Sequence, residues 1–223
     1  MARPLRFIVD NGIYHVLSRG HNRRQIFHDE DDFTKYLEIL LKSKEKYDLK
    51  LYHYALMTNH IHLIIMVPQS ANLSNAMRDL NQTYAQCYRM KYGGVGYVWQ
   101  GRFKSFLIQN GVYLLQCGRY IEINPVVAGL VKNPEDYRWS SCGNYISGKR
   151  DKLVDMDPEF LSLSENLEER KKIYEEFLKD GLKEKRSIER YFKAGAYGDE
   201  NFIGILKQRG LKQVTWKVGR PGK

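Results

Sequence analysis

The chain has 223 residues, of which 43% are hydrophobic and 28% are charged, and its formal net charge at pH 7 is +10. This composition is that of a globular protein, with enough chain for one sizeable domain plus an extension, and it excludes a disordered or fibrous class. The positive charge favours a polyanionic partner such as nucleic acid, and the alternative is a protein that is merely basic.

The cysteines Cys87, Cys117 and Cys142 have no metal-site spacing. An odd, sparse set is typical of reduced thiols in a cytosol. Residues 1–6 lack the apolar core of a signal peptide, and no apolar stretch approaches the length of a membrane span. We therefore expect a cytoplasmic protein.

The first predicted strand lies within residues 7–17, because Ile13-Tyr14-His15-Val16-Leu17 alternates along the chain. From residue 1 to residue 24 the only acid is Asp10. Basic side chains lie on both sides of the strand, and they are Arg3, Arg6, Arg19, Arg23 and Arg24. We interpret them as a candidate phosphate-binding edge, and the alternative is a solvated loop.

Two amphipathic helices are predicted over residues 29–47 and 72–91. Asp29 or Asp31 can cap the first helix, and an asparagine or a serine can cap the second. The glycine-rich residues 93–96 that follow are expected to form a flexible loop.

Between these helices, strands over residues 49–57 and 60–67 are predicted to form a hairpin around Thr58-Asn59. His60 and His62 are two residues apart on a strand, so they share one face and are spaced to hold one metal ion. The apolar residues between and after them point to the other face, into a core, and they are Ile61, Leu63, Ile65 and Val67.

Residues 98–106 mix aromatic rings with cations and lead into a short predicted strand over 106–108. Rings and cations together can hold a single nucleic-acid strand by stacking and charge. The candidate nucleic-acid-binding residues of this segment are Trp99, Arg102, Phe103 and Lys104. The alternative is a half-buried edge strand with Trp99 and Phe106 in the core.

A further helix is predicted from about residue 110 to Asn124, because Pro125 disfavours helix in the residue before it. Helical spacing predicts one side made of Leu114, Leu115, Gly118 and Ile121. It predicts an opposite side made of Tyr113, Cys117, Tyr120 and Asn124.

The domain organisation follows from a change of composition near residue 148. We predict a first domain over residues 1–147 and a mainly helical extension over residues 148–223 with a basic tail. The mixed charges of residues 164–190 are typical of a solvated helical face, and from residue 207 to the end there is no acid. That tail is expected either to contact nucleic acid or to be disordered.

A histidine pair on a strand is weak evidence for chemistry by itself. Tyr120 and Asn124 can supply a nucleophile and a third ligand if their helix lies across the sheet face that bears the histidines. A phenol titrates near 10, so a metal would assist by polarising the phosphate under attack rather than by ionising the phenol. His15 and His53 fall in predicted strands and are expected to be core or edge residues, with a supporting role near the metal as the alternative for His53.

Taken together, these motifs resemble those of a known family. His60-Ile61-His62 is similar to the histidine-hydrophobe-histidine motif of HUH single-strand endonucleases. Tyr120-Ile121-Glu122-Ile123-Asn124-Pro125 resembles the tyrosine-bearing helix of their single-tyrosine transposase branch. The chain is most similar to REP-associated tyrosine transposases, relatives of the transposases of the smallest bacterial insertion sequences, over about residues 5–145.

The resemblance implies an α+β, ferredoxin-like fold in which helices pack on an antiparallel sheet. It implies a metal-dependent nuclease and strand transferase for single-stranded DNA, acting near hairpins such as REP-like palindromes. Tyr120 would attack the scissile phosphate and form a 5′-phosphotyrosine. His60, His62 and Asn124 would bind Mg²⁺ or Mn²⁺, and the protein would be a monomer or a homodimer.

Ligand chemistry leaves the choice of metal open. Imidazoles favour Mn, Co, Ni or Zn, whereas Mg prefers oxygen ligands. We expect Mn²⁺ to bind well and Mg²⁺ to be the cellular ion. The alternative functions are a non-catalytic single-stranded nucleic-acid-binding protein and, less in keeping with the charge, a zinc hydrolase.

Overall fold

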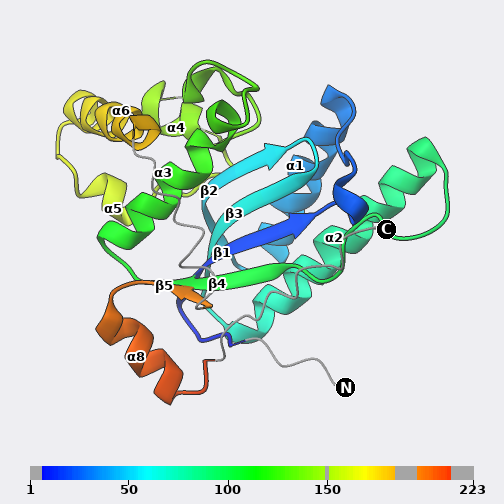
Figure 1. Ribbon diagram of the computed structural model, residues 1–223, viewed down its shortest axis with the longest axis horizontal. Coiled ribbons are helices and arrows are strands. Elements are labelled where there is room, and N and C mark those ends of the chain that lie inside the picture. The colour runs from blue at the N-terminus through cyan, green and yellow to red at the C-terminus, as the bar shows by residue number, and fades with distance from the viewer. Residues whose placement is uncertain (1–6, 149–150, 184–194, 212–223) are drawn as a thin grey trace, which may run out of the picture.

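A five-stranded sheet forms the centre of the fold, in the order β2-β3-β1-β4-β5 (Figure 1). The computed structural model describes residues 7–148, 151–183 and 195–211. The strands are β1 (Gly12–Arg19), β2 (Lys50–Met57), β3 (His60–Val67), β4 (Lys104–Ile108) and β5 (Ala196–Tyr197). The first four pair antiparallel, as predicted, and β5 adds a parallel edge to β4, which makes the sheet mixed.

The predicted hairpin is present, with Met57 opposite His60 across the Thr58-Asn59 turn. Strand β3 then lies between β2 and β1, so both of its edges are hydrogen-bonded. Neither edge can slip without moving a row of buried apolar side chains to the other face. The register that places the histidines is therefore fixed from both sides.

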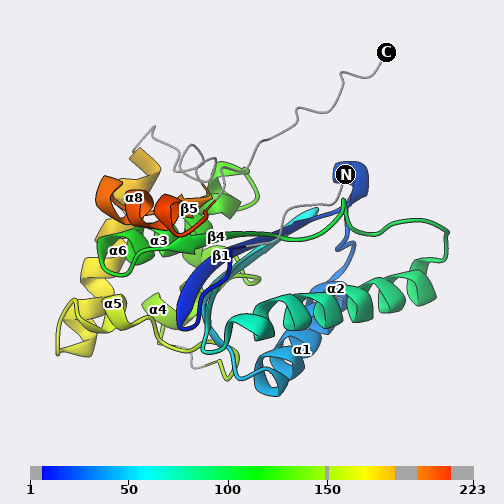
Figure 2. The ribbon, with the colours of Figure 1, turned by 90° about the horizontal axis from the view of Figure 1, so that it is seen from below.

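The two faces of the sheet are covered by different helices (Figure 2). Helices α1 (Glu30–Lys46) and α2 (Ser70–Tyr92) cover one face, and α3 (Val112–Val127) covers the other. Asp29 caps α1 by accepting a hydrogen bond from the Asp32 backbone N–H, as predicted. Helix α2 begins two residues earlier than predicted, where Asp10 accepts a hydrogen bond from the Ser70 N–H at 2.6 Å.

Helix α3 continues past its predicted end at Asn124 and includes Pro125. A proline in the last turn removes only one helical hydrogen bond, and the Ala128 N–H still closes the turn onto the Asn124 carbonyl at 2.9 Å. Pro125 is also buried, so packing offsets the local cost. Prediction from the proline alone placed the end of the helix too early.

Helix α3 is buried on two sides. Leu114, Cys117 and Ile121 pack against the sheet, whereas Leu115 and Ile123 pack against the helices that follow. The prediction that Cys117 lies opposite Leu114 and Ile121 is therefore wrong. The reason is that a helix covered on two sides has two apolar stripes, and spacing does not show which residue belongs to which stripe.

The C-terminal residues pack around α3 and along the sheet edge. Helices α4 (Cys142–Ile146), α5 (Pro158–Leu161) and α6 (Leu167–Lys183) share a buried cluster with α3, and α8 (Glu200–Gln208) follows β5. The remaining described elements are the 3-10 turns η1 (His21–Arg23) and η2 (Pro134–Asp136). These observations confirm the α+β class with a helical C-terminal region, and the division at residue 147 stays a prediction.

No helix within residues 7–148, 151–183 and 195–211 is both long enough and apolar enough to cross a membrane.

Candidate functional site

The histidine pair lies on the sheet face that α3 covers. Alternation along β3 sends Ile61 and Leu63 into the opposite core, where both are fully buried. His60 and His62 face α3, with ring centroids 4.9 Å apart. His62 is buried and His60 is only partly so. The two imidazoles are therefore placed side by side at the end of β3, as the sequence predicts.

Each imidazole is held through its Nδ1 atom. The Nδ1 of His60 lies 2.6 Å from the Asn59 Oδ1, and the Nδ1 of His62 lies 2.8 Å from the Nε2 of His15. An Nδ1–H donating to an acceptor leaves Nε2 with its lone pair, which is the form that binds a metal. His15 was missed as a partner of the pair, because the sequence does not show that β1 lies next to β3.

Burial keeps these rings neutral. It lowers the pKa of His60 to about 4, with the nearby Arg19 charge adding to the effect. The pKa of His62 is lowered well below its ordinary value, first by burial and then by His15. Metal ligands must be deprotonated, so the pair is already in the ligand state at neutral pH.

Helix α3 lies across this face and brings Tyr120 to the histidines. The Tyr120 ring centroid is 5.9 Å from that of His62 and 6.2 Å from that of His15, with the rings edge-on. One turn later, the Nδ2 of Asn124 donates to the Tyr120 carbonyl at 2.7 Å. The amide oxygen of Asn124 is thereby the atom left for a ligand role.

The two neutral imidazoles offer nitrogen donors that suit a divalent cation. In the part of the chain that the structure describes, no three His, Cys, Asp or Glu side chains gather in a metal-binding group. The third ligand that the sequence predicts is the amide of Asn124. Two neutral imidazoles and one amide oxygen leave coordination positions for phosphate oxygens and water.

Basic side chains stand at the same end of the sheet. Arg19 is opposite His60 in the register of β1 and β3, and Lys104 is opposite Leu17 in that of β1 and β4. Burial, followed by the Arg19 charge, lowers the pKa of Lys104 to about 8. Further cations of the predicted set are exposed, namely Arg23, Arg24 and Arg102. Arg3 and Arg6 lie outside the described residues.

The prediction that Trp99 and Phe103 stack on bases is not supported by their positions. They are 9% and 6% exposed and belong to the core beneath α1 and α2. The Trp99 indole N–H donates to the Asn81 carbonyl at 2.8 Å, and its ring packs near Tyr84. Their apolar surface is used to close the core, which was the alternative interpretation of this segment.

The other side of α3 carries a buried ionic cluster. The Nδ1 of His53 lies 2.9 Å from the Glu122 Oε1, and its Nε2 lies 2.9 Å from the Asp157 Oδ2. All three side chains are fully buried. Burial alone lowers the pKa of His53, but the two carboxylates outweigh it and raise that pKa to about 9. The cluster joins β2, α3 and the residue that caps α5.

Both oxygens of Glu122 accept further hydrogen bonds. Ser141 donates to Oε1 at 2.6 Å, and Tyr174 of α6 donates to Oε2 at 2.9 Å. Close approach of α3 to His53 requires Gly118, since a Cβ there would lie 2.7 Å from the imidazole. Glu122 is two residues from Tyr120, so this cluster fixes the helix that carries the tyrosine. Sequence spacing gave no sign of it, because its members are far apart along the chain.

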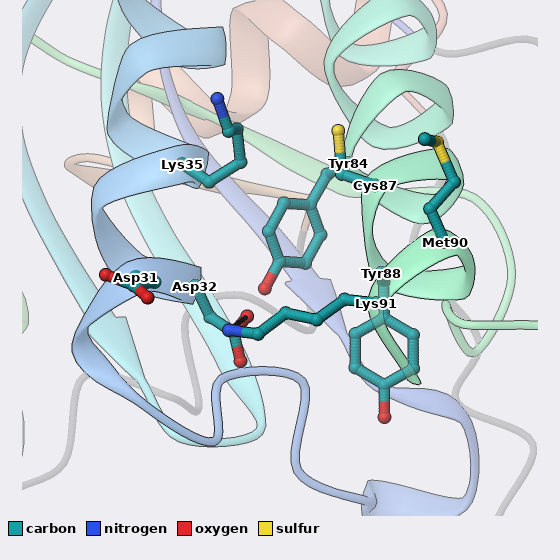
Figure 3. A pocket seen from close by; sticks show the side chains of 8 residues that line it. All are labelled: Asp31, Asp32, Lys35, Tyr84, Cys87, Tyr88, Met90 and Lys91. Carbon is teal, nitrogen blue, oxygen red and sulfur yellow. Dashed lines mark hydrogen bonds and ion pairs between the residues drawn. The ribbon is translucent and has the colours of Figure 1, made fainter. Parts of the chain in front are cut away.

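A pocket of about 400 Å³ lies elsewhere, between α1 and α2 (Figure 3). Figure 3 shows Lys91 reaching from α2 to Asp32 on α1, at 2.9 Å. The Asp32 carboxylate also accepts hydrogen bonds from Tyr92 and from the His28 N–H. The charged and hydroxyl groups around this pocket therefore join α1 to α2. The pocket lies on the face of the sheet away from the histidines.

Comparison with known proteins agrees with this geometry. The family model described as "Transposase IS200 like" matches residues 8–124, which include both histidines, Tyr120 and Asn124. No curated protein matches the chain significantly.

Two solved structures match the chain in a comparison of structures. A REP-associated tyrosine transposase bound to a REP hairpin is 21% identical, with a TM-score of 0.57, and the alignment covers 70% of this chain and 90% of that one. A protein from Deinococcus radiodurans, named as a candidate transposase, is 17% identical with a TM-score of 0.38, covering 55% and 95% of the two chains. The family match confirms the resemblance found in the motifs, and the chain belongs to the IS200-like transposase family.

Proposed function

We propose that this protein is a metal-dependent endonuclease and strand transferase that cleaves single-stranded DNA next to hairpins. The observation that carries the proposal is the Tyr120 ring 5.9 Å from that of His62, on a helix that also bears Asn124. Membership of a transposase family supports the reaction class. The hairpin is proposed because a structure of the same fold was solved with a REP hairpin.

In the proposed step, the Tyr120 hydroxyl oxygen attacks the scissile phosphorus and its proton passes to solvent. The bond from phosphorus to the 3′-oxygen breaks, and that oxygen takes up a proton to become a 3′-hydroxyl. The product is a 5′-phosphotyrosine. Because one phosphate ester replaces another, little bond energy is lost, and a 3′-hydroxyl can reverse the step and join strands.

His60, His62 and Asn124 would hold the metal ion. When bound, the ion supplies Lewis-acid chemistry that stabilises charge on the phosphate oxygens. Neutral imidazoles favour Mn²⁺ over Mg²⁺, and Mg²⁺ is proposed as the cellular ion. Arg19 and Lys104 would add positive charge at the same end of the sheet and bind the DNA backbone.

The test is covalent attachment of a hairpin-bearing single strand in the presence of Mn²⁺ or Mg²⁺. We expect wild type to form an adduct that survives SDS, and Tyr120→Phe to lose the adduct while its DNA affinity is retained. Tyr113→Phe, on the same helix and near the Tyr197 ring, is the matched control and should form the adduct.

An adduct that persists in Tyr120→Phe would show that the nucleophile is wrongly assigned. Binding of the DNA by wild type without cleavage, in both metals, would instead favour the non-catalytic nucleic-acid-binding alternative.

A further inference from the structure

An exposed aromatic ring stands in the connection between α2 and β4, which is green at the right of Figure 2. Tyr97 is 78% exposed, whereas Trp99, two residues later, is 9% exposed. A tyrosine ring exposed to this degree presents its aromatic face to solvent, where a planar group can stack on it. The connection therefore does present an aromatic side chain, at a different residue from those predicted.

The backbone of Tyr97 is anchored to the turn that follows β1. Arg24 donates from Nη2 to the Tyr97 carbonyl at 2.7 Å, and the His21 N–H donates to the Val98 carbonyl at 2.8 Å. The His21 ring centroid lies 6.2 Å from that of Tyr97. The backbone that carries the ring is thus held in place, which lowers the entropy cost of binding a planar group there.

The same turn is hydrogen-bonded to Asn59, the residue before the histidine pair. The Gly20 N–H donates to the Asn59 carbonyl at 2.8 Å, and the Asn59 side chain donates to the Arg23 carbonyl at 3.1 Å. Asn59 is also the residue that holds the Nδ1 of His60. A short series of hydrogen bonds therefore connects the proposed metal site to Tyr97.

The surroundings favour a polyanion over a protein partner. Between Asp48 and Glu122 the only acid is Asp79, and residues 11–28 contain none. Arg23 and Arg24 are exposed in this turn. Unpaired bases stack on aromatic rings, and their phosphates are attracted to such cations.

We infer that Tyr97 is a stacking platform for an unpaired base of the DNA strand that enters the active site, with Arg23 and Arg24 contacting the backbone beside it. This inference rests on the proposed function, since it names a substrate contact of the same site. It assigns to Tyr97 a role in binding, separate from the bond-breaking assigned to Tyr120.

The test measures binding of a hairpin-bearing single strand with one 2-aminopurine in its unpaired flank, over a series of NaCl concentrations. It uses the Tyr120→Phe background so that no cleavage occurs. Adding Tyr97→Ala should raise Kd by about 5-fold to 150-fold and reduce the quenching of 2-aminopurine. Tyr97→Phe should keep the Kd and the quenching of the background protein, because the aromatic face remains. Val95→Ala, at a fully exposed neighbour in the same connection, is the control and should bind as the background does.

The salt dependence separates stacking from charge. Tyr97→Ala should leave the slope of log Kd against log salt unchanged, whereas Arg23→Gln should reduce it by about 0.7. Unchanged affinity and quenching in Tyr97→Ala would overturn the inference while leaving the proposed function intact. Failure of the background protein to bind the oligonucleotide at all would overturn both.

Discussion

At the scale of single residues, the two histidines of the pair differ in what holds them. His60 is held by an amide oxygen, whereas His62 is held by a second imidazole, that of His15. When a ligand histidine donates a hydrogen bond to a second ring, that bond fixes the tautomer of the ligand histidine and raises its basicity. His15 is therefore part of the site without being proposed as a metal ligand.

Replacing His15 should weaken metal binding. His15→Leu removes the acceptor for His62 but keeps apolar volume next to Phe106. We expect Mn²⁺ affinity to fall by about 10-fold to 100-fold, measured by isothermal titration calorimetry. His28→Leu, at an exposed histidine packed near Tyr92, should leave it unchanged. Equal affinities in His15→Leu and wild type would remove His15 from the site.

At the scale of elements, α3 matters most, because it carries the proposed nucleophile and is clamped from its other side. The clamp consists of the His53 imidazole between Glu122 and Asp157, reached only because Gly118 lacks a Cβ. The imidazole is bonded at both nitrogens, so it has little freedom to move away from a new side chain.

Gly118→Ala should therefore destabilise the protein and displace Tyr120. Overpacking of this kind costs about 1–3 kcal/mol, so Tm should fall, and the rate of adduct formation should fall with it. In the control Gly204→Ala in α8, an added Cβ meets nothing within 4 Å, so the free energy of unfolding should rise by about 0.5–1 kcal/mol. A Tm for Gly118→Ala at or above that of wild type would argue against the close approach.

The clamp also predicts how stability depends on pH. The folded-state pKa of His53 is about 9, above its ordinary value of 6.5, so the folded state binds the proton more tightly. This contribution is fully present below about pH 6.5 and is lost as pH rises towards 9. The urea concentration at the unfolding midpoint should fall across that pH interval in wild type and fall less in His53→Gln. The same dependence of this midpoint on pH in both proteins would show that His53 is not charged when folded.

Alternation and helical spacing in the sequence predicted which side chains share a face within one strand or helix. Alternation placed His60 and His62 on one face of β3, and helical spacing placed Tyr120 one turn from Asn124. Neither pattern could show which element packs on which. The partnership of His15 with His62 depends on the pairing of strands, and it was not predicted.

The sequence patterns also did not determine which side chains are buried. Trp99, Phe103 and Tyr97 have the same sequence character, yet only Tyr97 is exposed. Pro125 was expected to end α3, but its burial keeps it within the last turn. In each case long-range packing outweighed the local preference.

At the scale of the whole molecule, the C-terminal residues complete the environment of α3. Asp157 accepts a hydrogen bond from His53, Tyr174 donates one to Glu122, and β5 extends the sheet beside β4. A chain of residues 1–147 would lose these partners and leave buried charges uncompensated, at a cost of about 3–5 kcal/mol. We predict that it does not unfold cooperatively, as judged by circular dichroism during thermal denaturation. A sharp transition near that of the full chain would show that residues 1–147 fold independently.

The central claim, that Tyr120 becomes linked to DNA, is tested most directly by locating the linkage among the sixteen tyrosines of the chain. Wild-type protein is incubated with a hairpin-bearing single strand and Mn²⁺, the adduct is digested with nuclease and protease, and the modified peptide is identified by mass spectrometry. We predict a single nucleotide-bearing peptide in which the modification lies on Tyr120. A modification on any other residue, or a cleaved strand with no modified peptide, would contradict the account.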